Sequence, residues 1–170
     1  MRNEVSRRTM LFGHSGLSGQ DDVIRPPWSL KRDAFAKKCT GCGECVTACP
    51  ENILKIDERK LAKVDFSKGE CTFCRDCVAS CRDGALVMLD PETPWSLSIS
   101  IEGKCLAMKG IECRACDDQC EPRAIRFRLT AGAVAVPQLD QHQCTGCGAC
   151  VSVCPSEAIV IKPELNEEGE

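Results

Sequence analysis

The chain has 170 residues, with 25 acidic and 22 basic side chains and a formal charge of −3. This balance argues against a nucleic-acid-binding protein, because such proteins usually carry a basic surface. No stretch approaches the ~18 consecutive apolar residues of a membrane span. Five Phe, two Trp and no Tyr accompany 16 Cys. We therefore expect inorganic centres, rather than a large aromatic core, to fill much of the interior and to contribute to folding.

The first 25 residues lack a sustained apolar period, and we expect a flexible arm over 1–25. Its Ser6-Arg7-Arg8 start resembles a twin-arginine export signal. Export also requires an apolar segment, whereas a polar, glycine-rich stretch follows Phe12. We therefore expect a cytoplasmic protein, in a compartment where thiols stay reduced and available to iron.

All 16 cysteines fall into four runs. Three runs have the spacing C-x2-C-x2-C-x3-C, and in the third run along the chain seven residues, instead of two, separate the first cysteine from the second. Run one is Cys39, Cys42, Cys45 and Cys49; run two is Cys71, Cys74, Cys77 and Cys81; run three is Cys105, Cys113, Cys116 and Cys120; run four is Cys144, Cys147, Cys150 and Cys154. This spacing is typical of bacterial ferredoxins, which bind [4Fe–4S] clusters through Cys thiolates.

Zinc and disulfides are the alternatives for so many thiols. Structural zinc is held by two C-x2-C pairs, which leaves the regular third and fourth cysteines of each run unexplained. Disulfides require an oxidising compartment. The spacing therefore predicts four [4Fe–4S] clusters, with a structural zinc module as the alternative.

A longer repeat divides the chain into two halves. The residues Pro-Trp-Ser-Leu at 27–30 return at 94–97. Because repeats of long period indicate repeated structural units, we expect one module over 26–92, a second over 93–163 and an acidic tail over 164–170. Run one then shares a module with run two, and run three with run four.

Local patterns predict an α+β fold. A small or apolar pair follows each run at a fixed distance, which predicts a short helix that begins at each fourth cysteine and packs on the cluster. Pro50 and Pro155 suit the first turn of such a helix. Apolar residues alternate over 54–66 and 125–136 around a turn, which predicts β-hairpins. The expected architecture is two tandem bacterial-ferredoxin-like 2[4Fe–4S] modules. The pairs are Ile53/Leu54, Ala85/Leu86, Ala124/Ile125 and Ala158/Ile159.

In a two-cluster ferredoxin, the fourth cysteine of each run ligates the other cluster. Crossing the runs in this way assigns Cys39, Cys42, Cys45 and Cys81 to cluster one; Cys71, Cys74, Cys77 and Cys49 to cluster two; Cys105, Cys113, Cys116 and Cys154 to cluster three; and Cys144, Cys147, Cys150 and Cys120 to cluster four. Glycines between ligands allow backbone N–H groups to turn toward sulfur and tune its potential: Gly41, Gly43, Gly146 and Gly148. The cluster that includes Cys105 is expected to differ, because its spacer must loop out.

Every cysteine is needed as a ligand, so none is spare as a nucleophile. The sequence contains no GxGxxG run, no P-loop and no radical-SAM spacing C-x3-C-x2-C. We therefore predict an electron-transfer protein rather than an enzyme. It would receive electrons from a redox donor protein and associate with basic or mixed-charge partner surfaces.

The chain resembles the NapF family of ferredoxin-type accessory proteins. The resemblance rests on the four runs, the Ser6-Arg7-Arg8 start and the Arg-Pro-Pro-Trp stretch at 25–28. Its most specific part is the stretched third run, with Glu112-Cys113-Arg114 and Cys120-Glu121-Pro122. The resemblance implies a cytoplasmic protein with four [4Fe–4S] clusters. It also implies interaction with the catalytic molybdenum subunit of the periplasmic nitrate reductase, and a role in maturing that subunit before export. A plain electron carrier without a maturation role is the alternative.

Overall fold

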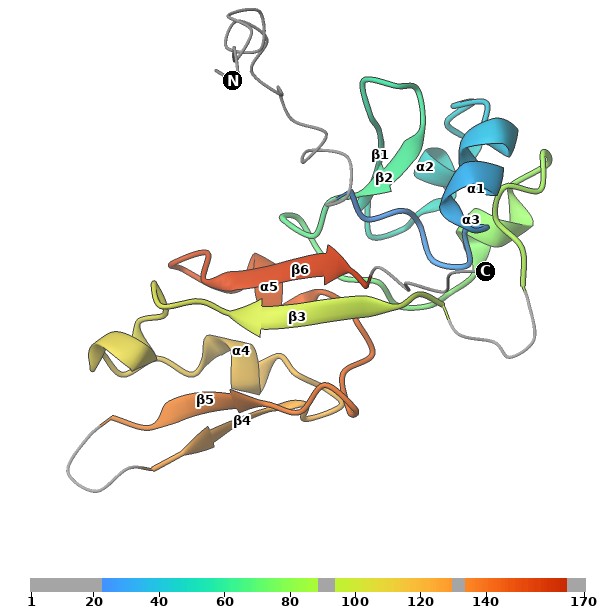
Figure 1. Cartoon of the computed structure of the whole chain (residues 1–170). Coiled ribbons are helices and arrows are strands. Elements are labelled where there is room, and N and C mark those ends of the chain that lie inside the picture. Colours follow the sequence, from blue (N-terminus) through green and yellow to red (C-terminus); the bar gives the residue numbers. More distant parts are fainter. Residues whose placement is uncertain (1–22, 89–93, 130–133, 165–170) are drawn as a thin grey trace, which may run out of the picture.

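The computed structural model describes residues 23–88, 94–129 and 134–164, which form the two modules seen in Figure 1. Short helices and three two-stranded antiparallel sheets make up the described chain, which agrees with an α+β fold. In order they are α1 (Arg32–Lys38), α2 (Glu44–Ala48), β1 (Leu54–Ile56), β2 (Ala62–Val64), α3 (Asp76–Ala79), β3 (Leu97–Ile101), the 3₁₀-helix η1 (Ala107–Lys109), α4 (Ala115–Asp118), β4 (Ile125–Arg128), β5 (Val136–Leu139), α5 (Ala149–Ser152) and β6 (Ile159–Pro163).

Each module contains one of the hairpins that the alternating patterns predict. Strands β1 and β2 pair antiparallel with Leu54 opposite Val64, and β4 and β5 pair with Ile125 opposite Leu139. One face of each hairpin is buried, because Leu54 and Ile125 belong to the buried core of their own module. The hairpin prediction is confirmed in both modules.

A second, long-range pairing in each module does not follow from the local patterns. In the second module β3 pairs antiparallel with β6, and Leu97 lies opposite Pro163. In the first module the equivalent segment makes only an isolated bridge between Ser29 and Leu86. The repeated Trp-Ser-Leu segment thus pairs, in each module, with the chain that follows the last cysteine run (Figure 1).

The helices do not begin at the fourth cysteines, and this prediction is wrong. Helices α2 to α5 each end before the fourth cysteine of their run. That cysteine instead opens a tight turn, in which its carbonyl oxygen accepts the N–H of the residue three positions on. The pairs are Cys49–Asn52, Cys81–Gly84, Cys120–Arg123 and Cys154–Glu157, with N···O distances of 3.2, 3.4, 2.9 and 3.2 Å. The turn reverses the chain, because the donor residue has a left-handed φ of 50–63° in all four copies.

The small or apolar pair after each run is buried in every copy. It follows the tight turn directly, and its second residue begins β1, β4 or β6 or, in the case of Leu86, forms the isolated bridge. The prediction that these pairs lie against the cysteines therefore holds, but strands and a bridge carry them instead of helices.

At both ends of the described chain, residues just outside the expected module bounds contact the modules. Ile24 accepts a hydrogen bond from the Val64 N–H, and Arg25 pairs with Asp57, so contacts with the first module begin before Pro26. At the other end, the Glu164 N–H donates to the Ser96 oxygen over 3.0 Å. The rest of the predicted arm and tail, 1–22 and 165–170, lies outside the described residues. Within the described part of the chain, no helix is long and apolar enough to span a membrane.

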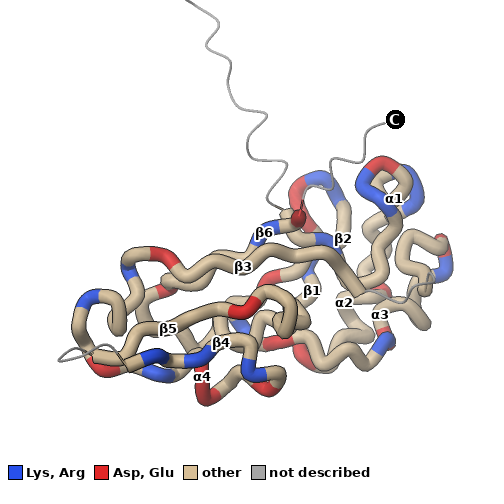
Figure 2. Tube along the Cα trace, turned by 60° about the horizontal axis from the view of Figure 1, so that its bottom comes forward, with Lys and Arg blue, Asp and Glu red and all other residues tan. Residues whose placement is uncertain are grey.

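Basic residues are concentrated on α1, at one end of the first module (Figure 2). Phe35 is the buried residue of this helix, and the other residues of α1 are exposed. Lys31, Arg32, Lys37 and Lys38 therefore form an exposed basic surface, although the chain as a whole is acidic.

Candidate iron–sulfur cluster sites

Four cysteines from both runs of the first module line one cavity, which we call site one. Cys39, Cys42 and Cys45 come from run one, and Cys81 comes from the end of run two. Helix α2 carries Cys45 inward, and the turn after α3 brings Cys81 to the same space. The cavity measures about 360 Å³, and its remaining wall is largely apolar, with Phe35, Ile56, Ala62, Ala85 and Leu86.

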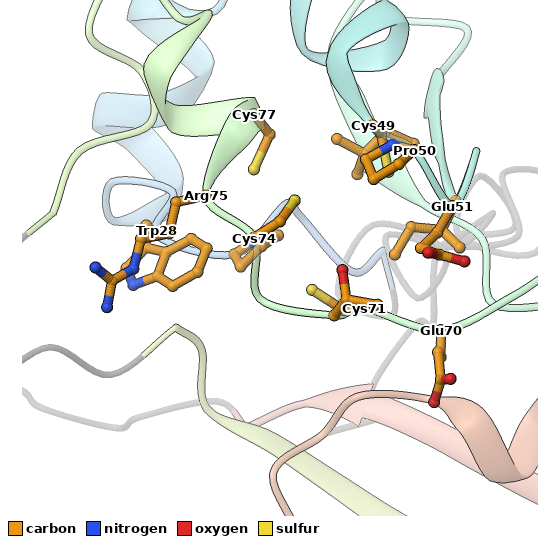
Figure 3. A pocket seen from close by; sticks show the side chains of 13 residues that line it. Trp28, Cys49, Pro50, Glu51, Glu70, Cys71, Cys74, Arg75 and Cys77 are labelled. Atoms are coloured by element: carbon orange, nitrogen blue, oxygen red, sulfur yellow. The ribbon is translucent and has the colours of Figure 1, made fainter.

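Site two is the reciprocal arrangement in the same module, shown in Figure 3. Cys71, Cys74 and Cys77 approach from the loop before α3 and from α3 itself, and Cys49 approaches from the other side of the cavity. The cavity measures about 340 Å³. Besides these thiols, the apolar side chains of Trp28, Ile53 and Leu54 line part of it, and Glu51, Glu70 and Arg75 line another part.

Sites three and four occupy the second module. Site four is a cavity of about 360 Å³ lined by Cys120 of run three and by Cys144, Cys147 and Cys150 of run four. Site three is the predicted group of Cys105, Cys113, Cys116 and Cys154, in which burial and the charges of the other three thiols raise the pKa of Cys116. Here Cys105 is buried beside Ala107 and Ala158, with Cys154 against the same small cluster.

The cysteines thus gather in the four groups that the crossed assignment names. In each group three thiols come from one run and one comes from the end of the neighbouring run. Which thiols bind iron stays a prediction. The grouping itself is a consequence of the tight turn after each run, which sends the fourth cysteine away from its own helix.

Burial raises the pKa of several thiols in these sites, and the charge of neighbouring thiols raises it further. The pKa reaches about 11 for Cys45, Cys71 and Cys116 and about 12 for Cys77 and Cys150. Thiolates are the ligating form of cysteine. A positive core between the four sulfurs would offset both burial and mutual repulsion, so this donor set fits an iron–sulfur cluster.

The sulfurs do not converge as the ligands of one ion would. Within residues 23–88, 94–129 and 134–164, no group of three or more Cys, His, Asp or Glu side chains could hold a single metal ion. A structural zinc site needs four ligands at about 2.0–2.3 Å from one centre. A cube of four irons holds its ligands farther apart, at separate corners, which matches thiols placed around a cavity.

The loops between ligands have the same backbone conformation in runs one, two and four. Two residues of each loop have left-handed φ values: Gly41 and Gly43 (68° and 82°), Phe73 and Arg75 (55° and 71°), and Gly146 and Gly148 (73° and 82°). This conformation favours glycine, yet run two adopts it with two larger residues. Run three differs, because Arg114 has a φ of −133° at the position of Gly43.

The left-handed loops direct backbone N–H groups at sulfur, as the glycine pattern predicts. Although burial raises the pKa of Cys144 overall, a hydrogen bond from the Gly146 N–H opposes that rise. The Phe73 N–H has the same effect on Cys71. Donors of this kind stabilise negative charge on sulfur and thereby tune a cluster's reduction potential.

Site three has a donor that the sequence does not reveal. The Ala158 N–H donates to the Cys154 sulfur over 3.2 Å, and the Ser156 hydroxyl lies 3.7 Å from it. Burial opposes ionisation of Cys154, but these donors outweigh it and lower the pKa of the thiol. No side-chain pattern could have indicated the main donor, because it is a backbone group.

The stretched spacer of run three loops out, as expected, and forms the 3₁₀-helix η1. Within it Ala107 is buried and Met108 and Ile111 are exposed. The spacer thus encloses Cys105, which is 8% exposed, while its own middle remains in solvent. In run three, the spacer with η1 stands between the first and second cysteines, where the other runs have a short loop that contains a left-handed residue.

Comparison with known proteins agrees with this geometry. The family described as "4Fe-4S dicluster domain" matches residues 38–85 and 109–158. The first match includes all eight cysteines of runs one and two, and the second includes run four and run three without Cys105. Fold and sites together define a protein built from two iron–sulfur dicluster domains.

Ferredoxin-type proteins match most of the chain. "Ferredoxin-type protein NapF" of Haemophilus influenzae is 48% identical over 81% of this chain and 78% of its own. "Ferredoxin-type protein NapF" of Escherichia coli K12 is 40% identical over 95% of this chain and 97% of its own. "Ferredoxin-type protein NapG" of the same organism is 32% identical over 86% of this chain and 73% of its own. The chain belongs to the NapF family of ferredoxin-type proteins.

Proposed function

We propose that this chain is an electron-transfer protein that holds four [4Fe–4S] clusters, one in each site, and that it has no substrate site of its own. The observation that supports the proposal is that sites one, two and four are each cavities lined by four cysteines from two runs, while Cys105 and Cys154 share one small cluster in site three. The clusters would supply one-electron chemistry. The two ferredoxin-like modules, over 26–92 and 93–163, would hold them.

The chain's own residues would set how readily each site accepts an electron. Apolar residues form part of the wall of sites one, two and four, and an apolar surrounding disfavours added negative charge. Backbone donors such as Gly146 and Ala158 oppose this effect at their own sulfurs. Because the loops of run three differ from the others, we expect site three to have a potential of its own.

We further propose that the protein acts in the cytoplasm on the catalytic molybdenum subunit of the periplasmic nitrate reductase, before that subunit is exported. Membership of the NapF family, together with the similarity to NapG, supports this proposal. The chain would supply electrons during maturation of the subunit's own metal centres, after receiving them from a redox donor protein.

The exposed basic surface of α1 offers a place for such a partner to dock. Phe35 of this helix lines site one, so an acidic surface bound to Lys37 and Lys38 would lie beside that site. Attraction between these surfaces should weaken as salt screens it. The chain as a whole is acidic and would attract basic partner surfaces. The basic surface of α1 would instead bind an acidic partner surface.

Iron and acid-labile sulfide analysis of the anaerobically purified protein tests the first proposal. Four cubes require about 16 iron and 16 sulfide per chain. Stoichiometric zinc without sulfide would show a structural zinc module instead and would remove every redox role proposed above.

Binding to the nitrate reductase catalytic subunit tests the second proposal. The iron-loaded chain should capture the precursor form of that subunit, and the double substitution Lys37→Glu with Lys38→Glu should weaken capture. Arg126→Glu with Arg128→Glu, the same change of charge at two exposed positions of β4 in the second module, is the matched control. Failure to bind either the precursor or the mature form of that subunit, with full reductase activity in cells lacking the chain, would contradict the maturation role. The chain would then be a plain electron carrier.

A further inference from the structure

We propose that an electron crosses between the two modules where run two meets run four, so that the sites lie in the order one, two, four, three. This order differs from the order of the runs along the chain. The inference rests on the proposed electron-transfer function. It concerns which residues join the two modules and therefore which two sites are neighbours across the junction.

The two runs touch through their backbones. The N–H of Cys71 donates a hydrogen bond to the carbonyl oxygen of Cys147, with an N···O distance of 2.8 Å. Cys71 belongs to site two and Cys147 to site four. A path of a few covalent bonds on each side of this hydrogen bond therefore links a sulfur of one module to a sulfur of the other.

Aromatic side chains hold this junction together. Trp95 packs edge-on against Phe66 and Phe73 of the first module, with ring centroids 5.8 and 6.0 Å apart. Its indole N–H donates to the oxygen of Thr145, in run four, over 3.1 Å. Trp95 thus contacts both modules beside the Cys71–Cys147 hydrogen bond.

Two glycines of run four allow this close approach. A Cβ atom at Gly146 would lie 2.7 Å from the Trp95 Nε1, and one at Gly148 would overlap the Phe66 ring. At the matching position of run one, Gly43 has open space where a Cβ would stand. Run four is therefore shaped for contact with the first module, in addition to holding its own site.

Helix contacts within each module complete the order. Helices α2 and α3 pack together and carry Cys45 of site one and Cys77 of site two. In the second module α4 packs on α5, which brings Cys116 of site three toward Cys150 of site four. Site one and site three thus lie at the two ends.

The electron balance of the crossing is simple. One electron leaves site two and enters site four, so the first is oxidised and the second is reduced, and no bond or proton is exchanged. A protein carrier that donates one electron would reduce the chain at one end, and an iron–sulfur or molybdenum partner would accept the electron at the other. The same path would serve the reverse direction.

Pulsed EPR of the reduced protein tests the order, because reduced clusters are paramagnetic and interact according to their separation. Cys147→Ser removes a ligand of site four, and Cys113→Ser removes the equivalent ligand of site three. We expect loss of the strongest inter-module dipolar interaction in Cys147→Ser and its retention in Cys113→Ser. Loss in Cys113→Ser with retention in Cys147→Ser would overturn the proposed order.

A second pair of variants keeps every ligand in place. Trp95→Ala removes the aromatic contact at the junction, and Phe127→Ala removes a ring that packs against the core clusters of the second module. With iron content unchanged in both, we expect a weaker inter-module interaction only in Trp95→Ala. An unchanged interaction in Trp95→Ala would overturn the role assigned to the junction. Wild-type protein without iron would instead overturn the proposed function itself.

Discussion

Residues 39–43 and 144–148 have the same sequence, Cys-Thr-Gly-Cys-Gly, and nearly the same backbone conformation. Their surroundings differ. Gly41 faces the Lys60 carbonyl oxygen and Gly43 faces open space, whereas Gly146 and Gly148 face Trp95 and Phe66 across the module junction. One local motif therefore holds a terminal site in the first module and an inner site in the second. The motif supplies the cysteines, whereas residues distant in sequence determine what packs against its two glycines.

The comparison of the two motifs assumes that the fourth cysteine of each run belongs to the site of the neighbouring run. Substitution of such a cysteine tests this assumption and should have the largest effect. Cys81→Ser should remove about four iron atoms per chain, the content of one cube, from the site held mainly by run one. Site two should be retained, because its four thiols remain. Iron analysis with EPR measures the outcome.

Cys49→Ser is the matched control, because it removes the fourth cysteine of run one. It should spare site one and affect site two. If Cys81→Ser altered only the signals of site two, the cysteines would not be crossed, and each run would hold its own cluster.

Alanine at the matching glycines sharpens the comparison of surroundings. Gly43→Ala and Gly148→Ala both force a left-handed residue, at a cost of about 1 kcal/mol. Only Gly148→Ala also drives a methyl group into Phe66, and overpacking adds about 1–3 kcal/mol. The anaerobic thermal midpoint, followed by visible absorption, should fall further for Gly148→Ala. Equal shifts would mean that the junction is loose.

The first module also has a charged anchor at its hairpin turn. Asp57 accepts hydrogen bonds from the Arg59 and Leu61 N–H groups, each over 2.9 Å, and from Arg25 over 2.7 Å. Asp57→Ala should destabilise the module by about 1–3 kcal/mol, because these donors lose their partner. Glu58→Ala, at an exposed position of the same turn, should have little effect on the thermal midpoint.

The same anchor gives a pH dependence. Burial opposes ionisation of Asp57, but the donors and the charge of Arg25 outweigh it and lower the pKa of the carboxyl group from its ordinary 3.8. The stabilisation is therefore present above that ordinary pKa and is lost as pH falls through the lowered value. Asp57→Asn should remove this part of the acid dependence. An identical acid profile for wild type and Asp57→Asn would contradict the assignment.

The smallest expected difference in stability between the modules concerns two arginines, each of which lies over an aromatic ring. Arg114 lies over the Phe127 ring with its guanidinium carbon 5.2 Å from the centroid, and Arg25 lies over Phe35 at 5.6 Å. Arg114 is exposed, so Arg114→Gln should cost about 0.5–1 kcal/mol. Arg25→Gln should cost more, since Arg25 also binds Asp57. Denaturant midpoints of both variants test this ranking.

Several features of this molecule could be predicted because they depend on neighbours in sequence. The cysteine spacing indicated ferredoxin-type sites, and the alternation around residues 54–66 and 125–136 indicated hairpins that the structure contains. The helix prediction failed after each fourth cysteine, although Pro50 and Pro155 suit a helical first turn. A left-handed residue three positions on ends the turn, and in three of the four runs that residue is not glycine.

Other features were not predictable from local patterns. The pairing of β3 with β6 joins segments about 60 residues apart, and nothing in Leu97–Ile101 names its partner. Run two also adopts its left-handed loop with Phe73 and Arg75, where residue type argues against that conformation. Surrounding contacts decide both cases, because they outweigh weak local preferences.

The sequence by itself determined the class of chemistry: cysteines repeated at short, regular intervals are typical of proteins that bind iron–sulfur clusters, and that relation is local. Only the tertiary structure decided which sites are neighbours. Two copies of one pentapeptide have different surroundings because Trp95 and Phe66, distant along the chain, contact Gly146 and Gly148 in one copy, whereas Gly41 faces Lys60 and Gly43 faces open space in the other. Close approach of this kind depends on the path of the whole backbone, which no short stretch of residues specifies.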